Sequence, residues 1–476
     1  MRIVFYSTNS NVFDEETFKI TVMPSNAAAF KEFCAAHPED EFFCVTQKPG
    51  MFLPESDGSQ GGAAEVSESS GSQNDGSPLS NIRYLPLETD TDTFADNVLA
   101  LKPDLAIAMT FWIEPYDWLP VSDAIVGEKL QAAGVRTVCH SVQTSLVCFD
   151  KWRTHNELAR LGFEVPAAVF CDHDLYFCAG SNKEVIRNVY KESVFAQIKK
   201  LNLPLIIKDT TGLSSYGMTV VHTYGEAIGY LNSKRNNSNR LIEEFITGRQ
   251  FGLEIYGVPG NYTVLPPFEF SVNQYGITSP KQSIKIGPCE LPESLREMML
   301  KLAEGLELCG AAQVDLILDE NGVWHIIEIN PRLSGMSYTY ASMLGLSVFE
   351  MMYRTAVKMV VEPENLVVEC PRNTRSLSLS KGETTADLGK VLNLKLPLMP
   401  VSQMAELLKL PGIRLLNQTN DLAAKQEREK GFCECIIVSE NKEDLKKVID
   451  QLVTFGLDPE VSKGQLSELM QRFLSL

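Results

Sequence analysis

The sequence has few histidines, no long apolar run and no excess of basic residues. Its six histidines are isolated from one another, and none has the spacing of a metal motif. No apolar run approaches the ~20 residues that a bilayer-spanning helix needs. The first residues also lack the apolar core and cleavage site of a secretory signal. The formal net charge of −18 argues against nucleic acid or an anionic membrane as a main partner, so we expect small-molecule partners.

Disulfide spacing is also missing. The eleven cysteines are an odd number and are scattered, which suits a reducing cytoplasm and predicts a cytoplasmic protein. Cys433 and Cys435 fall in a strand-like run, where alternation predicts buried thiols rather than metal ligands.

The chain has 476 residues, of which 44% are apolar and 22% charged. This length and composition predict a globular protein of two or three domains.

The N-terminal part alternates short apolar strands with helices. Residues 2–7 and 104–109 read as strands, and residues 128–133 read as a helix that ends at Gly134 before another strand. This alternation predicts an open parallel α/β layer. The Ser/Gly/Asp-rich stretch at about 55–80 interrupts it and is expected to be a disordered surface loop.

From residue 150 onward the pattern changes. Residues 205–208 and 218–221 read as strands on either side of a polar Gly/Ser loop, and 241–245 and 251–256 as two more strands. Residues 294–308 form an amphipathic helical pattern, and 338–352 read as an apolar helix. A third region begins after Pro371 and contains a strand near 432–439 followed by an amphipathic helix.

The most informative stretch is residues 313–334, where two apolar runs flank Asn321-Gly322, a strong hairpin signal. A two-residue turn at this position sets Asp315 directly opposite Glu328. Asn330 then lies on the same face, two residues further along the strand. Opposed carboxylates destabilise a sheet, so we expect a cation between them. Oxygen ligands of this kind suit Mg²⁺ whose shell is completed by nucleotide phosphates.

This arrangement depends on the length of the turn. A four-residue turn would set Asp315 opposite Ile326 and leave Glu328 diagonal on the same face. A three-residue turn would separate the two carboxylates and remove the site. A hairpin with a solvated acidic face is the alternative, but the neighbouring residues are too apolar to favour it.

Lys208 ends an apolar strand, and a loop of small and hydroxylated residues follows it. Backbone N–H groups and hydroxyls in such a loop can turn toward phosphate oxygens, and the lysine supplies a charge to the same anion. Glu243 and Glu244 lie in a strand that enters a turn, where a strand edge can pair with adenine. A solvated edge is an equally good interpretation of these two residues taken alone.

Four motifs in this order resemble the ATP-grasp superfamily. They are the helix start Asp150-Lys151, the strand 205–208 with its Gly/Ser loop, the segment 242–248, and the stretch from Asp315 to Gly335. The last motif is similar to the carbamoyl-phosphate-synthase-like branch, and the resemblance covers roughly residues 130–350. The third region resembles the C-terminal domain of amino-acid ligases.

The resemblance implies an α/β fold, with α+β parts, in three domains. These are an N-terminal open parallel α/β layer at 1–145, a two-lobed ATP-grasp domain at 146–365, and a small C-terminal α+β domain at 366–476. A homodimer is compatible with this interpretation.

The resemblance also implies roles for individual residues, with ATP and Mg²⁺ (or Mn²⁺ in its place) as cofactors. Lys151 and Lys208 match the residues that hold the nucleotide phosphates, and Lys208 and Arg332 match residues that act on the transferred group. The other implied contacts are the glycine-rich lid (Thr211, Gly212, Ser214, Ser215, Gly217), the adenine hinge (Glu243, Glu244, Phe245, Ile246), the ribose contact (Gln250, or Glu254 in its place) and the metal ligands (Asp315, Glu328, Asn330).

Lys281 and Lys285 are further candidates for phosphate, although solvated surface lysines are the favoured interpretation. Tyr338, Tyr340 and Met336 could shape an acceptor pocket, but core packing is favoured for each of them.

The implied reaction is ATP-dependent carboxylate–amine ligation. A substrate carboxylate attacks the γ-phosphate, and an amine, such as that of an amino acid, then attacks the acyl-phosphate, with release of ADP and phosphate. Closure of the loop at 209–217 would exclude water. Two alternatives stay open: a carboxylase that forms carboxyphosphate, and a catalytically silent nucleotide sensor. No biotin-type Met-Lys-Met sequence is present, and all the implied ligands are retained.

Overall fold

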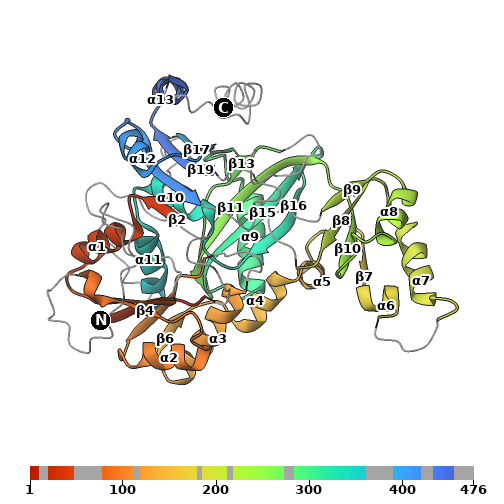
Figure 1. The fold of residues 1–476 in the computed structure, drawn as a ribbon, viewed down its shortest axis with the longest axis horizontal. Helices are drawn as coiled ribbons and strands as arrows, with labels where there is room; N and C mark the ends of the chain where they lie inside the picture. The colour runs from red at the N-terminus through yellow and green to blue at the C-terminus, as the bar shows by residue number, and fades with distance from the viewer. Residues whose placement is uncertain are drawn as a thin grey trace.

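The computed structural model describes residues 1–9, 20–47, 78–111, 118–179, 185–211, 218–272, 284–360, 390–419 and 432–454. These residues form three β-sheets with helices packed on their faces (Figure 1). Most of the predicted surface loop at 55–80 lies outside the described residues, and its last residues belong to the short 3₁₀ helix η1 (Pro78–Asn81). Among the described residues, no helix has the length and apolar character needed to cross a bilayer.

The N-terminal part forms the predicted parallel sheet. Its strand order is β4 (Ile82–Leu85), β3 (Glu41–Gln47), β1 (Arg2–Ser7), β5 (Leu105–Ala108) and β6 (Arg136–Val138). Successive residues of β1 point to opposite faces, so that Val4 and Tyr6 join the core under α2 (Thr91–Leu99) and α3 (Leu119–Ala132). Ile3 and Phe5 join the core on the other face, with α1 (Asn26–Ala36) and α11 (Val348–Val360). Helices cover both faces, which explains the continuous apolar character of this strand.

The second sheet is small and antiparallel. Its order is β7 (Ala168–Cys171), β10 (Arg240–Glu244), β8 (Leu205–Asp209) and β9 (Thr219–Val221). The helices α6 (His173–Phe177), α7 (Val189–Ile198) and α8 (Tyr224–Leu231) accompany it and share its apolar core. This lobe lies at one end of the molecule (Figure 1).

The third sheet has ten strands, and all of its pairings are antiparallel. Its order is β16 (Trp324–Asn330), β15 (Gly310–Asp319), β11 (Gly248–Val258), β13 (Phe268–Phe270), β14 (Lys285–Gly287), β17 (Lys390–Pro397), β19 (Phe432–Ser439), β18 (Ile413–Thr419) and β2 (Ile20–Met23), with β12 (Asn261–Val264) paired to β11.

The C-terminal strands continue this large sheet, and the N-terminal strand β2 closes its far edge against β18. The divisions predicted near 145 and 365 therefore separate segments that share one sheet, and the three-domain division stays a prediction. In β19, Cys433 and Cys435 are fully buried, as their alternation in the strand predicts. The helices α12 (Val401–Leu407) and α13 (Lys442–Thr454) belong to this part.

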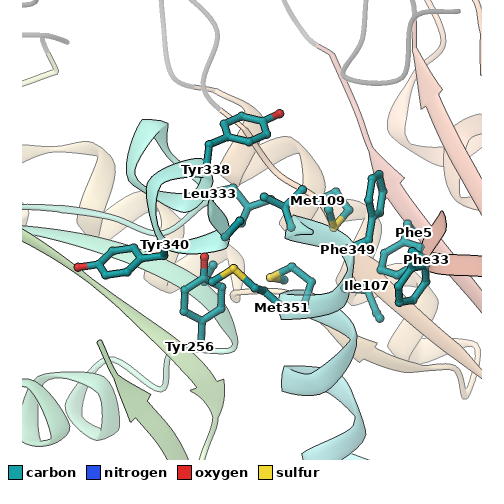
Figure 2. Close-up of a cluster of buried hydrophobic side chains, with 14 of the residues drawn as sticks. Phe5, Phe33, Ile107, Met109, Tyr256, Leu333, Tyr338, Tyr340, Phe349 and Met351 are labelled. Carbon is teal, nitrogen blue, oxygen red and sulfur yellow. The ribbon is translucent and has the colours of Figure 1, made fainter. Parts of the chain in front are cut away.

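Helices cover both faces of the central strands. The predicted amphipathic helix is α9 (Glu293–Gly305), which packs Leu295, Met299 and Leu302 against one face. The other face meets α10 (Gly335–Leu344) and α11, and Figure 2 shows the apolar cluster there. The rings of Phe5 in the parallel sheet and Phe349 in α11 meet edge to face, with their centroids 5.5 Å apart. The parallel sheet and the large sheet therefore share one core. Tyr340 and Met336 are core residues, as favoured from the sequence.

Candidate active-site cleft

Residues of the small sheet, of the large sheet and of the start of helix α5 (Lys151–Arg160) line a cleft. In Figure 1, α5 lies between the two sheets. The cleft contains about 900 Å³ of empty space, part of it open to solvent. Strands β8 and β10 form one wall, and β11, β15 and β16 form the other. Nine of the residues predicted from the sequence line this cleft: Lys151, Lys208, Glu243, Glu244, Phe245, Ile246, Gln250, Asp315 and Glu328.

The hairpin of β15 and β16 has a three-residue turn, so the predicted two-residue turn is wrong. The Asp319 N–H donates to the Val323 carbonyl oxygen at 3.0 Å, which leaves residues 320–322 as the turn. Gly322 adopts φ +81 there, a left-handed conformation that glycine accepts without strain. Leu318 pairs with Trp324, and continuing this register would set Asp315 opposite Ile327.

A β-bulge changes the register before Asp315 is reached. Leu316 pairs with Ile326, but Asp315 pairs with Glu328, so Ile327 is the extra residue on the bulged strand. The extra residue moves Glu328 from the face of the apolar core to the face of Asp315. The expectation that a three-residue turn would separate the carboxylates is therefore wrong, whereas their predicted pairing is found.

The two carboxylates face each other among cations. Lys151 Nζ lies 2.7 Å from Glu328 Oε1. Burial together with the Glu328 charge raises the pKa of Asp315 to about 7. Burial acts to raise the pKa of Glu328 as well, but Lys151 and Arg332 outweigh it, so this pKa lies below its usual value. The nearby positive charges of Arg332 and Lys285 act to lower the pKa of Asp315, but burial and the Glu328 charge outweigh them.

Asn330 and Arg332 continue the same strand end. Asn330 pairs with Gln313 across the ladder and so shares the face of Glu328. Arg332 is buried, and its Nη2 donates to Asn330 Oδ1 at 3.0 Å. Gln313 Nε2 donates to Asp315 Oδ1 at 2.8 Å. The amide oxygen, the two carboxylates and the guanidinium therefore lie together, as the sequence predicts.

These residues fit a hard divalent cation. Within the part of the chain that the structure describes, no group of three or more His, Cys, Asp or Glu side chains could hold a metal without help. Two carboxylates and one amide oxygen are instead a partial oxygen donor set, which suits Mg²⁺ when phosphate oxygens supply further ligands. Arg332 and Lys285 do not offset the burial of Asp315, which is consistent with a further cation at this position.

Lys208 and Glu243 form a buried ion pair in the small lobe, with Lys208 Nζ 2.6 Å from Glu243 Oε2. His155 Nδ1 lies 3.4 Å from the other carboxylate oxygen. Burial acts to raise the pKa of Glu243, but Lys208 and His155 lower it to about 2. Sequence reasoning missed His155, although its position four residues after Lys151 places both on one face of α5.

The opposite end of the cleft is more apolar. Phe245 and Ile246 line it at the end of β10, and the Phe245 N–H donates to the Pro204 carbonyl oxygen at 3.0 Å. Glu244 Oε1 accepts a hydrogen bond from the Asn202 N–H at 2.7 Å. Phe270 forms part of the facing wall. A planar apolar group such as a nucleobase would be compatible with these walls.

Gln250 and Glu254 lie on the same strand but in different surroundings. Gln250 lines the cleft. Glu254 is fully buried and accepts hydrogen bonds from Ser334, Ser337 and Tyr256 at 2.7–2.8 Å. Its burial raises its pKa to about 7. The suggestion that Glu254 replaces Gln250 as a ribose contact is therefore wrong, because hydroxyl groups at the start of α10 enclose its carboxylate.

Lys285 also differs from its prediction as a solvated surface residue. Its side chain is only 12% exposed, and Nζ lies 3.3 Å from Glu434 Oε1 of β19. Glu434 in turn accepts a hydrogen bond from Asn393 Nδ2 at 2.9 Å. Lys285 thus links the middle of the large sheet to its C-terminal strands, a contact that sequence spacing does not reveal.

A smaller cavity of about 340 Å³ adjoins the cleft beside Lys151 and Glu328. Thr211 and Asn330 also line it. The other residues predicted for the glycine-rich loop, Gly212, Ser214, Ser215 and Gly217, lie outside the described residues, and so does Lys281.

Comparison with known proteins finds matches over the same part of the chain. A family model described as "ATP-grasp domain" matches residues 148–336, which include the cleft residues from Lys151 to Glu328. A D-alanine–D-alanine ligase from Buchnera aphidicola subsp. Schizaphis graminum is 28% identical over 207 residues, which cover 41% of this chain and 63% of that protein.

A second curated relative is the carbamoyl phosphate synthase large chain of Clostridium botulinum. It is 26% identical over 202 residues, which cover 38% of this chain and 18% of that protein. The chain thus spans less than two thirds of the length of either relative.

Among solved structures, an L-amino acid ligase from Bacillus licheniformis shares the fold over nearly its whole length. The TM-score is 0.58 at 15% sequence identity, with 95% of this chain and 97% of that chain covered. The α/β fold predicted from the sequence is confirmed by this likeness and by the three sheets of the structure.

Proposed function

Since residues 148–336 are an ATP-grasp domain, we propose that the protein is an ADP-forming ligase that joins a carboxylate to an amine through an acyl-phosphate. The observation that carries this proposal is the pairing of Asp315 with Glu328 at one end of the cleft. Lys151 lies beside Glu328, and Lys208 and Arg332 are close enough to influence its ionisation.

ATP would bind along the cleft with its base toward Phe245 and Ile246. Gln250 would contact the ribose, and Lys151 and Lys208 would bind the phosphates. The two lysines come from different elements, since Lys208 belongs to β8 of the small sheet and Lys151 to the first turn of α5. Two cations placed in this way would fix the phosphate chain near the carboxylate pair.

Asp315, Glu328 and Asn330 would hold Mg²⁺, with Mn²⁺ as a substitute. The ion, when bound, neutralises charge on the phosphate oxygens. Asn330 Oδ1 also accepts a hydrogen bond from Arg332, so this guanidinium is already aimed at the metal-binding residues. Arg332 is thereby placed to bind the transferred phosphoryl group.

The reaction balances in two steps. A carboxylate oxygen of the first substrate forms a bond to the γ-phosphorus while the bond to the β–γ bridging oxygen breaks, which releases ADP. An amine then forms a bond to the acyl carbon, the acyl–phosphate bond breaks, and phosphate and a proton leave. Lys208 and Arg332 would stabilise the charge on the transferred group. Amino acids are the proposed source of both substrates.

Formation of ADP with pairs of amino acids, with the products read by mass spectrometry, tests this proposal. The Glu328→Gln variant is expected to form ADP about 10²- to 10³-fold more slowly, while the exposed turn variant Glu320→Gln keeps the wild-type rate. ADP formation that needs bicarbonate but no amine would instead favour a carboxylase. Binding of ATP without any ADP formation would favour a silent nucleotide sensor, and a fully active Glu328→Gln enzyme would refute the metal assignment.

A further inference from the structure

Helix α5 carries two basic side chains toward carboxylates of two different sheets. Lys151 Nζ lies 2.7 Å from Glu328 of the large sheet, and His155 Nδ1 lies 3.4 Å from Glu243 of the small sheet. The two residues are four positions apart and therefore lie on one face of the helix. The Lys151 N–H also donates to the Thr210 carbonyl oxygen at 2.7 Å, which ties the start of α5 to the end of β8.

Glu243 is shared between two partners. Lys208 Nζ lies 2.6 Å from one carboxylate oxygen, and His155 Nδ1 lies 3.4 Å from the other. The Glu243 side chain is only 7% exposed. The ionised form of Glu243 is therefore stabilised by these two neighbours more than by solvent.

The imidazole of His155 is held by stacking. The centroid of its ring lies 5.3 Å from that of the Trp152 ring, with an interplanar angle of 17°. The Trp152 ring in turn stacks on that of Phe170 in β7, with a centroid distance of 5.6 Å and an interplanar angle of 16°. The stack fixes the plane of the imidazole beside Glu243.

The proposed function places two demands on Lys208. It pairs with Glu243 when no nucleotide is bound, and it has to bind phosphate when ATP is present. If its ammonium group moves to the phosphates, Glu243 loses its closest counter-charge while it remains buried. A buried carboxylate left in this way opposes ATP binding.

We propose that His155 takes up a proton when ATP binds and so holds Glu243 while Lys208 turns to the phosphates. This inference rests on the proposed function. The proton comes from solvent, and no covalent bond to the nucleotide forms or breaks. His155 is thus a positioning residue that acts on ATP through Glu243.

The charged groups around His155 are consistent with this role. They are Glu243 on β10, Lys208 on β8 and Lys151 on its own helix, and Lys151 is paired with Glu328. On β7 the stacked neighbour is the uncharged Phe170. When Lys208 turns away, protonated His155 is the cation that remains 3.4 Å from Glu243 among the described residues.

Calorimetric titration with ATP and Mg²⁺ at pH 7.5, in buffers of different ionisation enthalpy, measures the protons taken up on binding. Wild-type protein is expected to take up more protons than His155→Gln, with a difference of up to about one per ATP. The variant should also bind ATP about tenfold more weakly. The control His173→Gln changes another histidine of the same lobe, which contacts Asp174, and should match the wild type.

A lysine at position 155 separates this role from a merely structural one. His155→Lys carries its charge in advance and should bind ATP nearly as tightly as the wild type, without the additional proton uptake. Equal proton uptake by the wild type and His155→Gln would overturn the inference alone. Failure of the wild type to bind ATP would overturn the inference together with the proposed function.

Discussion

Replacing Asp315 by asparagine should stabilise the protein when no metal is present. Asp315 faces Glu328 across the ladder, and its own hydrogen bond comes from the neutral Gln313 side chain. Asparagine keeps the size of the side chain and removes one of two opposed charges. The substitution therefore separates the metal-binding role of Asp315 from its effect on folding.

The raised pKa of Asp315 gives the size of the stabilisation expected from the Asp315→Asn substitution. A rise from 3.8 to about 7 corresponds to about 4 kcal/mol between the two protonation states. Asp315 is partly open to the cleft, where solvent screens its charge, so we expect about 2 kcal/mol. Because the pKa of Asp315 is higher in the folded state than in the unfolded state, its ionisation costs folding stability. This cost is absent at low pH and grows as the pH rises from about 4 to about 7. The gain from asparagine should therefore be largest at pH 8.

Thermal unfolding at pH 5 and pH 8, with and without Mg²⁺ and ADP, measures these effects. Without ligand at pH 8, Asp315→Asn should melt a few degrees above the wild type, and the difference should shrink at pH 5. Mg²⁺ with ADP should raise the melting temperature of the wild type more than that of the variant. A variant that melts below the wild type at pH 8, or that keeps the full ligand effect, would refute this reasoning.

Two further substitutions test contacts around the cleft. In Gly252→Ala, the new Cβ would lie 2.2 Å from the Phe270 ring, so the ring has to leave the cleft wall. The KM for ATP should therefore rise several-fold, with a smaller change in kcat. The control Gly229→Ala, whose Cβ would have no atom within 4 Å, should leave both constants unchanged. Lys285→Met removes the cation beside buried Glu434 and should cost about 3 kcal/mol in denaturant unfolding; an unchanged unfolding midpoint would contradict this contact.

Local patterns in the sequence predicted much of the fold. Apolar strands alternating with helices predicted the parallel sheet, and the 3.6-residue period predicted α9. The carboxylate pair was predicted from strand alternation and the hairpin signal at Asn321-Gly322. The parallel sheet and α9 are predicted correctly because their patterns are local or repeat with the period of a single element. The carboxylate pair is found as well, but it depends on a bulge that the local pattern did not predict.

The turn itself was predicted wrongly, for an identifiable reason. The Asn-Gly signal favours a two-residue turn, but the chain forms a three-residue turn and corrects the register with Ile327 in a bulge. The apolar residues Ile326 and Ile329 then both reach the core, while Glu328 faces Asp315. The register that sets Glu328 opposite Asp315 therefore also buries Ile326 and Ile329, and this burial depends on the neighbouring helices.

The sequence by itself determined which residue types are available for phosphate and metal binding, because strand ends and their alternation are properties of short segments. Only the tertiary structure decided which of them meet. It enclosed Glu254 among hydroxyl groups, paired Lys285 with Glu434 and brought His155 to Glu243. These partners are 80, 149 and 88 positions apart in the chain. Contacts across such separations follow from the packing of sheets and helices, which no local pattern encodes.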